Sequence, residues 1–83
     1  MKTYVDILRE LREDRDLTQA EVAKFLGTTQ QVYARYEKGI NELPLRHLQK
    51  LCTYYKVSAD YILCLPKGMD YPRQIAKQGQ KLS

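Results

Sequence analysis

Residues 17–39 read LTQAEVAKFLGTTQQVYARYEKG and contain the clearest structural signals of the chain. Thr18 and, three residues later, Glu21 can form a capping box, in which each side chain satisfies a backbone N–H of the other residue at the start of a helix. Gly27 can adopt the left-handed conformation that ends a helix without a steric penalty. These signals predict a short helix that begins after Thr18 and ends at Leu26.

A second helix is expected to follow at once. Thr29 is a favourable N-cap, because its side-chain oxygen can accept a hydrogen bond from a backbone N–H of the first turn. The helix is predicted to continue through Lys38 and to end at Gly39. Two short helices joined by a tight turn with a glycine at its head form a helix-turn-helix unit.

Three further helices are predicted around this unit, which makes the chain all-α. Apolar residues at helical spacing indicate a helix from about Thr3 to Asp14, and Pro44 precedes another, since the start of a helix does not require its missing N–H. Ser58 is expected to cap a fifth helix from Ala59 to Leu63. The buried stripe of the fourth helix is predicted to comprise Leu45, Leu48, Leu51, Cys52 and Tyr55.

The aromatic and histidine side chains are interpreted mainly as structural residues. Tyrosines could stack on nucleic-acid bases, but four of the seven fall on predicted buried stripes. His47 has no Cys or Asp arranged around it for catalysis, so a surface position is expected. Val32 can either pack or offer its methyl groups to DNA, and the sequence favours neither. The four tyrosines expected in the core are Tyr33, Tyr36, Tyr55 and Tyr61.

The composition is that of one globular domain, with 43% hydrophobic and 29% charged residues among 83. No apolar run approaches the roughly 18 residues that cross a bilayer. The N-terminal residues MKTYVD do not follow the pattern of a secretory signal. A cytoplasmic location is therefore expected.

The net charge of +4 and the pI of about 9.1 permit a nucleic-acid partner. The charge is unevenly distributed, because residues 1–42 contain seven Lys or Arg and eight Asp or Glu, whereas residues 43–83 contain seven and two. Charge alone is compatible with nucleic-acid binding and equally with a solvated surface.

Neither metal binding nor catalysis is expected. Cys52 and Cys64 lack a CxxC spacing or a histidine cluster, which argues against zinc. They are interpreted as reduced cysteines at apolar packing positions. No nucleophile–base pair or phosphate-binding loop is recognisable, so we expect no enzyme and no cofactor.

The chain resembles the Cro and phage-repressor family of helix-turn-helix transcriptional regulators, over about residues 4–64. This resemblance implies a five-helix, lambda-repressor-like DNA-binding domain at residues 1–65, with residues 66–83 as a C-terminal tail or dimerisation extension. It implies sequence-specific binding of double-stranded DNA by a transcriptional repressor. It rests on four segments in the family's order and spacing: LTQAEVA at 17–23, GTTQQ at 27–31, RYEKG at 35–39 and VSADYIL at 57–63.

The resemblance also implies which residues read bases. In the family the second helix of the motif enters the major groove, which places Gln30 and Gln31 against base edges. A glutamine can form two hydrogen bonds with adenine. Arg35, one turn further along, matches a contact with guanine or with phosphate. The alternative is that the two glutamines are merely solvated residues of a surface helix.

Contacts with DNA phosphates are implied for a second set of residues. Gln19 resembles the family residue that touches phosphate and braces the first base reader, here Gln30. The loop that begins at Gly39 departs from the family pattern, because it reads GINEL where basic residues are common. The phosphate-binding residues implied by the resemblance are Thr18, Gln19, Thr29, Lys38 and Asn41.

Two more features follow from the resemblance. Arg12 and Glu37 match a pair of positions that form an ion pair between the first and third helices, although each could be an ordinary surface charge. Lys56 stands where a glycine often ends the fourth helix. A side chain in the left-handed conformation costs on the order of 1 kcal/mol.

A palindromic operator and a weak homodimer are the partners implied, because one reading helix covers few base pairs. An antitoxin or protein-interaction module on the same fold, with a toxin as its partner, is the alternative. The tail is expected either to contribute to a self-contact or to lie along the DNA backbone. The residues for the first use are Cys64, Leu65, Met69 and Tyr71, and those for the second are Lys67, Arg73, Lys77 and Lys81.

Overall fold

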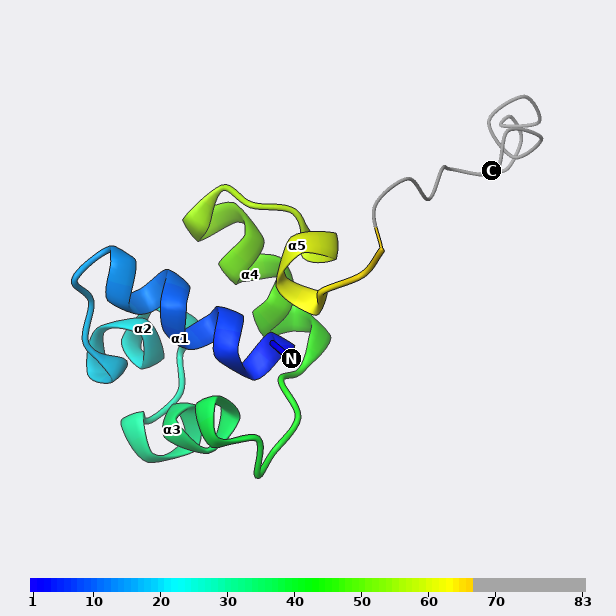
Figure 1. Ribbon diagram of the computed structural model, residues 1–83. Helices are drawn as coiled ribbons and strands as arrows, with labels where there is room; N and C mark the ends of the chain where they lie inside the picture. Colours follow the sequence, from blue (N-terminus) through cyan, green and yellow to red (C-terminus); the bar gives the residue numbers. More distant parts are fainter. Residues whose placement is uncertain (67–83) are drawn as a thin grey trace, which may run out of the picture.

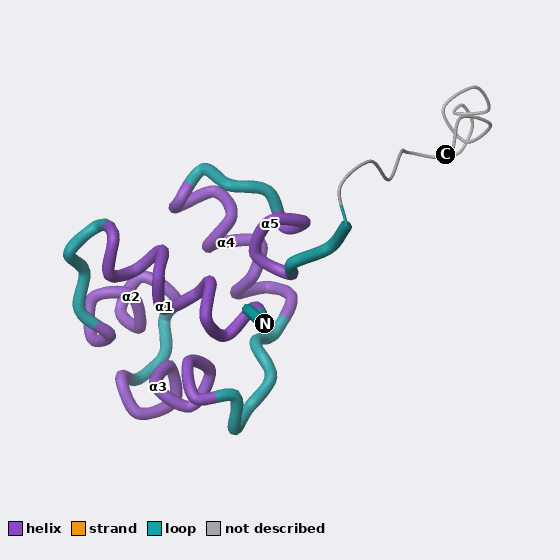
Figure 2. Tube along the Cα trace, viewed as in Figure 1, coloured by secondary structure: helices purple, strands orange, loops and turns teal. Residues whose placement is uncertain are grey.

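The computed structural model describes residues 1–66, which form five α-helices and no strands (Figure 2). The predicted all-α, five-helix fold is confirmed. None of these helices is both long enough and apolar enough to span a membrane. In chain order the helices are α1 (Tyr4–Asp14), α2 (Gln19–Leu26), α3 (Gln30–Lys38), α4 (Leu45–Tyr55) and α5 (Ala59–Leu63).

Helix α1 lies in the middle of the fold. It contacts α3 and α5, while α2 packs on α3 and α4 packs on α5. Figure 1 shows α1 between these two pairs, with α3 at the lower edge of the view. Helix α3 therefore has one face against the body of the domain and an opposite face that no other described helix covers.

Each helix contributes one side chain with no exposed surface to the common core. The burial of such a side chain contributes about 1.5–3 kcal/mol. Tyr36 and Tyr55 are also buried, as predicted, and Val32 packs partly against the same core. The fully buried side chains are Leu8, Val22, Tyr33, Leu51 and Ile62.

The helix ends are fixed by the caps that the sequence predicts. The Glu21 carboxylate accepts a hydrogen bond from the Thr18 backbone N–H at 2.8 Å, and the Thr18 hydroxyl accepts one from the Glu21 N–H at 3.1 Å. The Thr29 and Ser58 hydroxyls accept bonds in the same way at the starts of α3 and α5. Gly27 ends α2 in the left-handed conformation, with φ of 79°. The capping box and the turn are confirmed.

Four sequence-based expectations about packing are wrong. His47 was expected at the surface but is only 4% exposed, because it faces α3 and packs its ring edge-on against Tyr36. Leu45 was expected in the stripe of α4 but is 75% exposed, since it lies in the first turn, ahead of the residues that face the core. Tyr61 and Cys64 are exposed because α5 is a five-residue helix that buries Ile62 alone.

Replacing Lys56 by Gly is expected to raise the free energy of unfolding by about 0.5–1 kcal/mol. Lys56 ends α4 with φ of 59° and ψ of 47°, and glycine relieves the steric cost of that conformation at some cost in chain entropy. Gly27→Ala is the control of opposite sign, because a Cβ there meets no atom within 4 Å and only the backbone is strained. Urea denaturation followed by circular dichroism measures both. A destabilising K56G would contradict this account.

Candidate nucleic-acid interface

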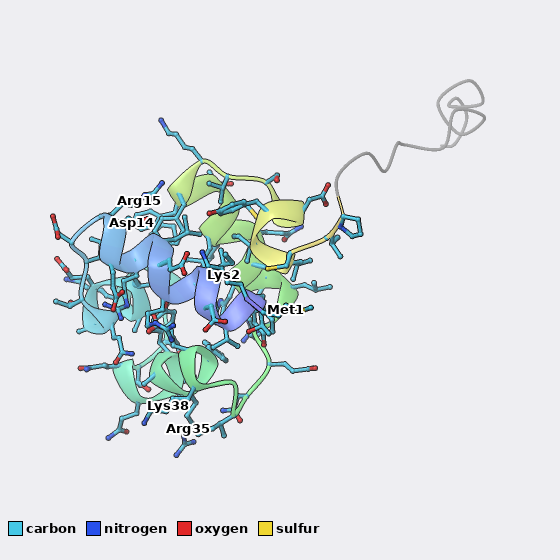
Figure 3. All side chains as sticks on the ribbon, in the orientation of Figure 1. Met1, Lys2, Asp14, Arg15, Arg35 and Lys38 are labelled. Carbon is cyan, nitrogen blue, oxygen red and sulfur yellow. The ribbon has the colours of Figure 1, made fainter. Side chains whose placement is uncertain are left out.

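The uncovered face of α3 carries polar and cationic side chains. Gln30 and Gln31 lie in its first turn and are exposed, as are Arg35 and Lys38 further along. Gln31 and Arg35 are four residues apart and so share one face of the helix. Figure 3 shows Arg35 and Lys38 projecting away from the body of the domain.

The buried face of α3 is held by an ion pair with α1. Arg12 donates to Glu37 through two nitrogens, from Nε to Oε2 at 2.7 Å and from Nη2 to Oε1 at 3.1 Å. Such bidentate pairs are among the stronger and more directional hydrogen-bonded contacts in proteins. The third nitrogen, Nη1, donates to the carbonyl of Leu17 at 3.0 Å, just before α2. Arg12 therefore joins α1 to α3 and to the start of the helix-turn-helix unit.

Gln19 completes this network from α2. Its Nε2 donates to Glu37 Oε1 at 3.1 Å, so one carboxylate receives hydrogen bonds from two other helices. Within residues 1–66 no hydrogen bond joins Gln19 to Gln30, the pair that the resemblance brings together. The side-chain amide of Gln19 is instead oriented by Glu37.

Glu37 stays ionised although its side chain is 4% exposed. Burial by itself raises the pKa of the Glu37 carboxyl, but the hydrogen bonds donated by Arg12 and Gln19 outweigh it and hold that pKa below its ordinary value. The stabilisation by the ionised group is therefore present at neutral pH. It is lost when the pH falls through this lowered pKa.

The residues expected to bind phosphate surround α3. The Thr18 and Thr29 hydroxyls accept hydrogen bonds from their own helices, which leaves the hydroxyl proton of each free to be donated. Asn41 is exposed in the loop after α3, where its backbone N–H donates to the Arg35 carbonyl at 3.4 Å. Thr29 directly precedes α3, Asn41 follows it, and Thr18 precedes Gln19, which contacts Glu37 of α3.

Two exposed cations on α4 were not singled out as site residues from the sequence. Arg46 and Lys50 are four residues apart on a helix that contains no Asp or Glu. The spacing and the lack of acids are visible in the sequence, but helical periodicity of apolar residues indicates only the buried stripe of α4 and not its exposed cations. Within residues 1–66, no three His, Cys, Asp or Glu side chains are grouped so as to hold a metal ion.

A family model described as helix-turn-helix matches residues 8–62 of the chain. The chain belongs to the helix-turn-helix regulators of the Cro and phage-repressor type. The resemblance seen in the sequence is thus confirmed. This family consists of transcriptional regulators, which agrees with the expectation that the chain is not an enzyme.

Two curated relatives of this helix-turn-helix chain have names that describe regulators. It is 42% identical over 50 residues to the cryptic phage CTXphi transcriptional repressor RstR of Vibrio cholerae, a match that covers 60% of this chain and 45% of that protein. It is 37% identical over 67 residues to the HTH-type transcriptional regulator YobD of Bacillus subtilis, covering 81% and 60%. The chain thus spans roughly half the length of these relatives.

Solved structures share the fold of this helix-turn-helix protein. A transcriptional regulator from Listeria innocua superposes with a TM-score of 0.74 at 18% identity, covering 93% of this chain and 72% of that one. The P22 c2 repressor, solved in complex with a synthetic operator, superposes with a TM-score of 0.70 at 22% identity, covering 76% and 96%. The lambda-repressor-like fold is confirmed by this likeness.

A double-mutant cycle on Arg12 and Glu37 is expected to show strong coupling. Arg12→Met leaves the buried Glu37 carboxylate without its cation, a change that costs about 3–5 kcal/mol in buried pairs. When Glu37→Gln is added, much of that cost should disappear, with a coupling energy of about 1–3 kcal/mol. Urea denaturation at neutral pH measures all four proteins.

The matched control is the Lys2–Glu10 pair, whose side chains are 62% and 36% exposed. Exposed pairs contribute about 0–1 kcal/mol, so its cycle should show little coupling. Equal coupling in the two cycles would refute the structural role of Arg12 and Glu37.

Proposed function

We propose that this helix-turn-helix protein binds double-stranded DNA sequence-specifically and acts as a transcriptional repressor, with α3 lying in the major groove. The main support for the proposal is that α3 has a buried face and an exposed face of different chemistry. Tyr33, Tyr36 and Glu37 are buried and fixed to the other helices, while the glutamines and cations face outward. A regulator of DNA acts where the DNA is, which for a bacterial or phage protein means the cytoplasm.

The recognition helix is proposed to begin after Thr29, with Gln30 and Gln31 reading bases. Each glutamine side chain can pair with the N6 and N7 atoms of adenine in the major groove. Arg35, on the same face as Gln31, is proposed to contact guanine or a phosphate. The relatives support the coarser proposal of operator binding by a repressor, because RstR is named a transcriptional repressor and the P22 c2 repressor was solved with an operator.

Phosphate contacts are proposed for the residues around α3. Hydroxyl, amide and ammonium groups all donate to phosphate oxygens, and such contacts set the position of a protein on the duplex. The hydrogen bond to Glu37 fixes the orientation of the Gln19 amide, so Gln19 is proposed to bind phosphate in that orientation. The proposed set is Thr18, Gln19, Thr29, Lys38 and Asn41.

We further propose that two copies bind a palindromic operator through an apolar face on α4 and α5. Leu45 is 75% exposed, Leu65 42% and Leu63 39%. Two open grooves adjoin this face, of about 490 and 240 Å³, and Leu45 and Leu48 line both. Apolar groups in such a surface are suited to a symmetric self-contact.

This proposal divides the chain into a DNA-binding domain at residues 1–65 and an extension at 66–83. Of the residues expected in the self-contact, Cys64 and Leu65 are exposed in the structure. The remaining ones, Met69 and Tyr71, lie outside the described residues, as do the tail cations Lys67, Arg73, Lys77 and Lys81.

Converting Gln30 or Gln31 to Ala is expected to cost about 1–3 kcal/mol of binding free energy on a duplex selected from a random library. Each variant should also relax the preference at one base position. Asp14→Asn, which changes an exposed polar residue at the end of α1, is the control and should bind as the wild type does. If both α3 variants retain wild-type affinity and preference, these residues do not read bases.

Leu45→Gln and Leu65→Gln are expected to weaken binding to a two-half-site operator far more than binding to an isolated half-site. The reason is that they remove apolar surface from the self-contact and leave α3 unchanged. Sedimentation of the protein–DNA complexes reports the number of bound copies. Ile40→Gln, which changes a 65% exposed residue in the loop after α3, should leave this number unchanged. Two copies bound by the Leu variants with wild-type cooperativity would exclude this face.

A further inference from the structure

The exposed side of α4 has two chemically different flanks. Residues 45–55 contain no acid, and the cations Arg46 and Lys50 are exposed and four residues apart, so they lie on one flank. The other flank carries Leu45, Gln49 and Cys52, which line the 490 Å³ groove beside Val57 and Ala59. The apolar flank thus adjoins α5.

The cationic flank adjoins the helix-turn-helix unit. His47, which follows Arg46, is buried with its ring 5.9 Å from the ring of Tyr36 on α3. Tyr54, four residues after Lys50, stacks on Phe25 of α2 with ring centroids 4.2 Å apart. These two contacts orient α4 so that the side carrying Arg46 and Lys50 borders α2 and α3.

Both cations are free of carboxylate partners within residues 1–66, as are Arg35 and Lys38 on α3. By contrast, several cations at and before α1 already form ion pairs. Lys2 and Arg9 pair with Glu10 and Asp6, and Arg12 pairs with Glu37. The cations of α3 and of the adjoining flank of α4 are therefore available to a polyanion, whereas those near the start of the chain are largely neutralised by carboxylates.

The free cations also affect the residue between them. Burial lowers the pKa of His47, and the positive charges of Arg46 and Lys50 lower it further. His47 has no carboxylate in contact with it among the described residues, and its Nδ1 has no hydrogen-bond partner there. The electrostatic potential on this flank is therefore positive, because no carboxylate among the described residues neutralises the two cations.

We propose that Arg46 and Lys50 form a second phosphate-binding element, which contacts the DNA backbone beside the groove that α3 occupies. The inference rests on the proposed function, because it assigns the ligand of this flank as the phosphates of the same duplex. The inference is supported by charge complementarity with DNA phosphates. Arg46 and Lys50 are unpaired cations on a helix face without acids, and this face borders α3. They supply the attraction that the loop after α3 lacks, since Glu42 is its only charged residue.

The test is the salt dependence of binding to a duplex of random sequence. A protein that neutralises phosphates releases counterions, and the slope of log K against log salt concentration changes by about 0.9 for each contact. Arg46→Gln and Lys50→Gln should each reduce this slope by about 1, and the double variant by about 2. The charge-preserving Arg46→Lys should keep the wild-type slope.

Lys56→Gln is the matched control, because it removes an exposed cation from the other end of the same helix and should not change the slope. Circular dichroism verifies that each variant is folded. Unchanged slopes in folded Arg46 and Lys50 variants would overturn this inference while leaving the proposed function intact. A wild-type protein that binds no duplex at low salt would overturn the proposed function itself.

Discussion

The carboxylate of Glu37 is the group on which the arrangement of α3 depends. It belongs to α3, yet its hydrogen-bond donors come from Arg12 on α1 and Gln19 on α2. A buried carboxylate is costly unless it is paired and hydrogen-bonded, so any displacement of α3 relative to the other two helices would leave charge uncompensated. The network therefore restrains both the position and the rotation of α3, and with them the direction of its exposed side chains.

The packing of α4 against α3 determines which side chains α4 exposes on each of its flanks. With Tyr36 and His47 packed together, α4 lies beside α3 and presents cations on that side and apolar residues towards α5. A polyanion and a second copy of the chain would thus occupy different flanks of one helix. Both uses are compatible, because neither requires a residue that the other buries.

Local features of the structure could be predicted from the sequence, because they depend on neighbouring residues. The capping box at Thr18 and the left-handed end at Gly27 are examples. Long-range packing was harder to predict. Helical periodicity located the stripe of α4 but not its edges, so Leu45 was included and His47 was omitted. Arg12 and Glu37 are 25 residues apart, and family resemblance rather than any local pattern suggested that they pair.

The central claim is that α3 reads the major groove of a specific duplex. The most direct measurement is methylation interference on a duplex that the wild-type chain has selected from a random library. Guanine N7 lies in the major groove and adenine N3 in the minor groove, so methylation at the two atoms distinguishes the grooves. If α3 lies in the major groove, N7 methylation within the selected site is expected to block binding. Failure to enrich any sequence, or interference by N3 methylation alone, would contradict this claim.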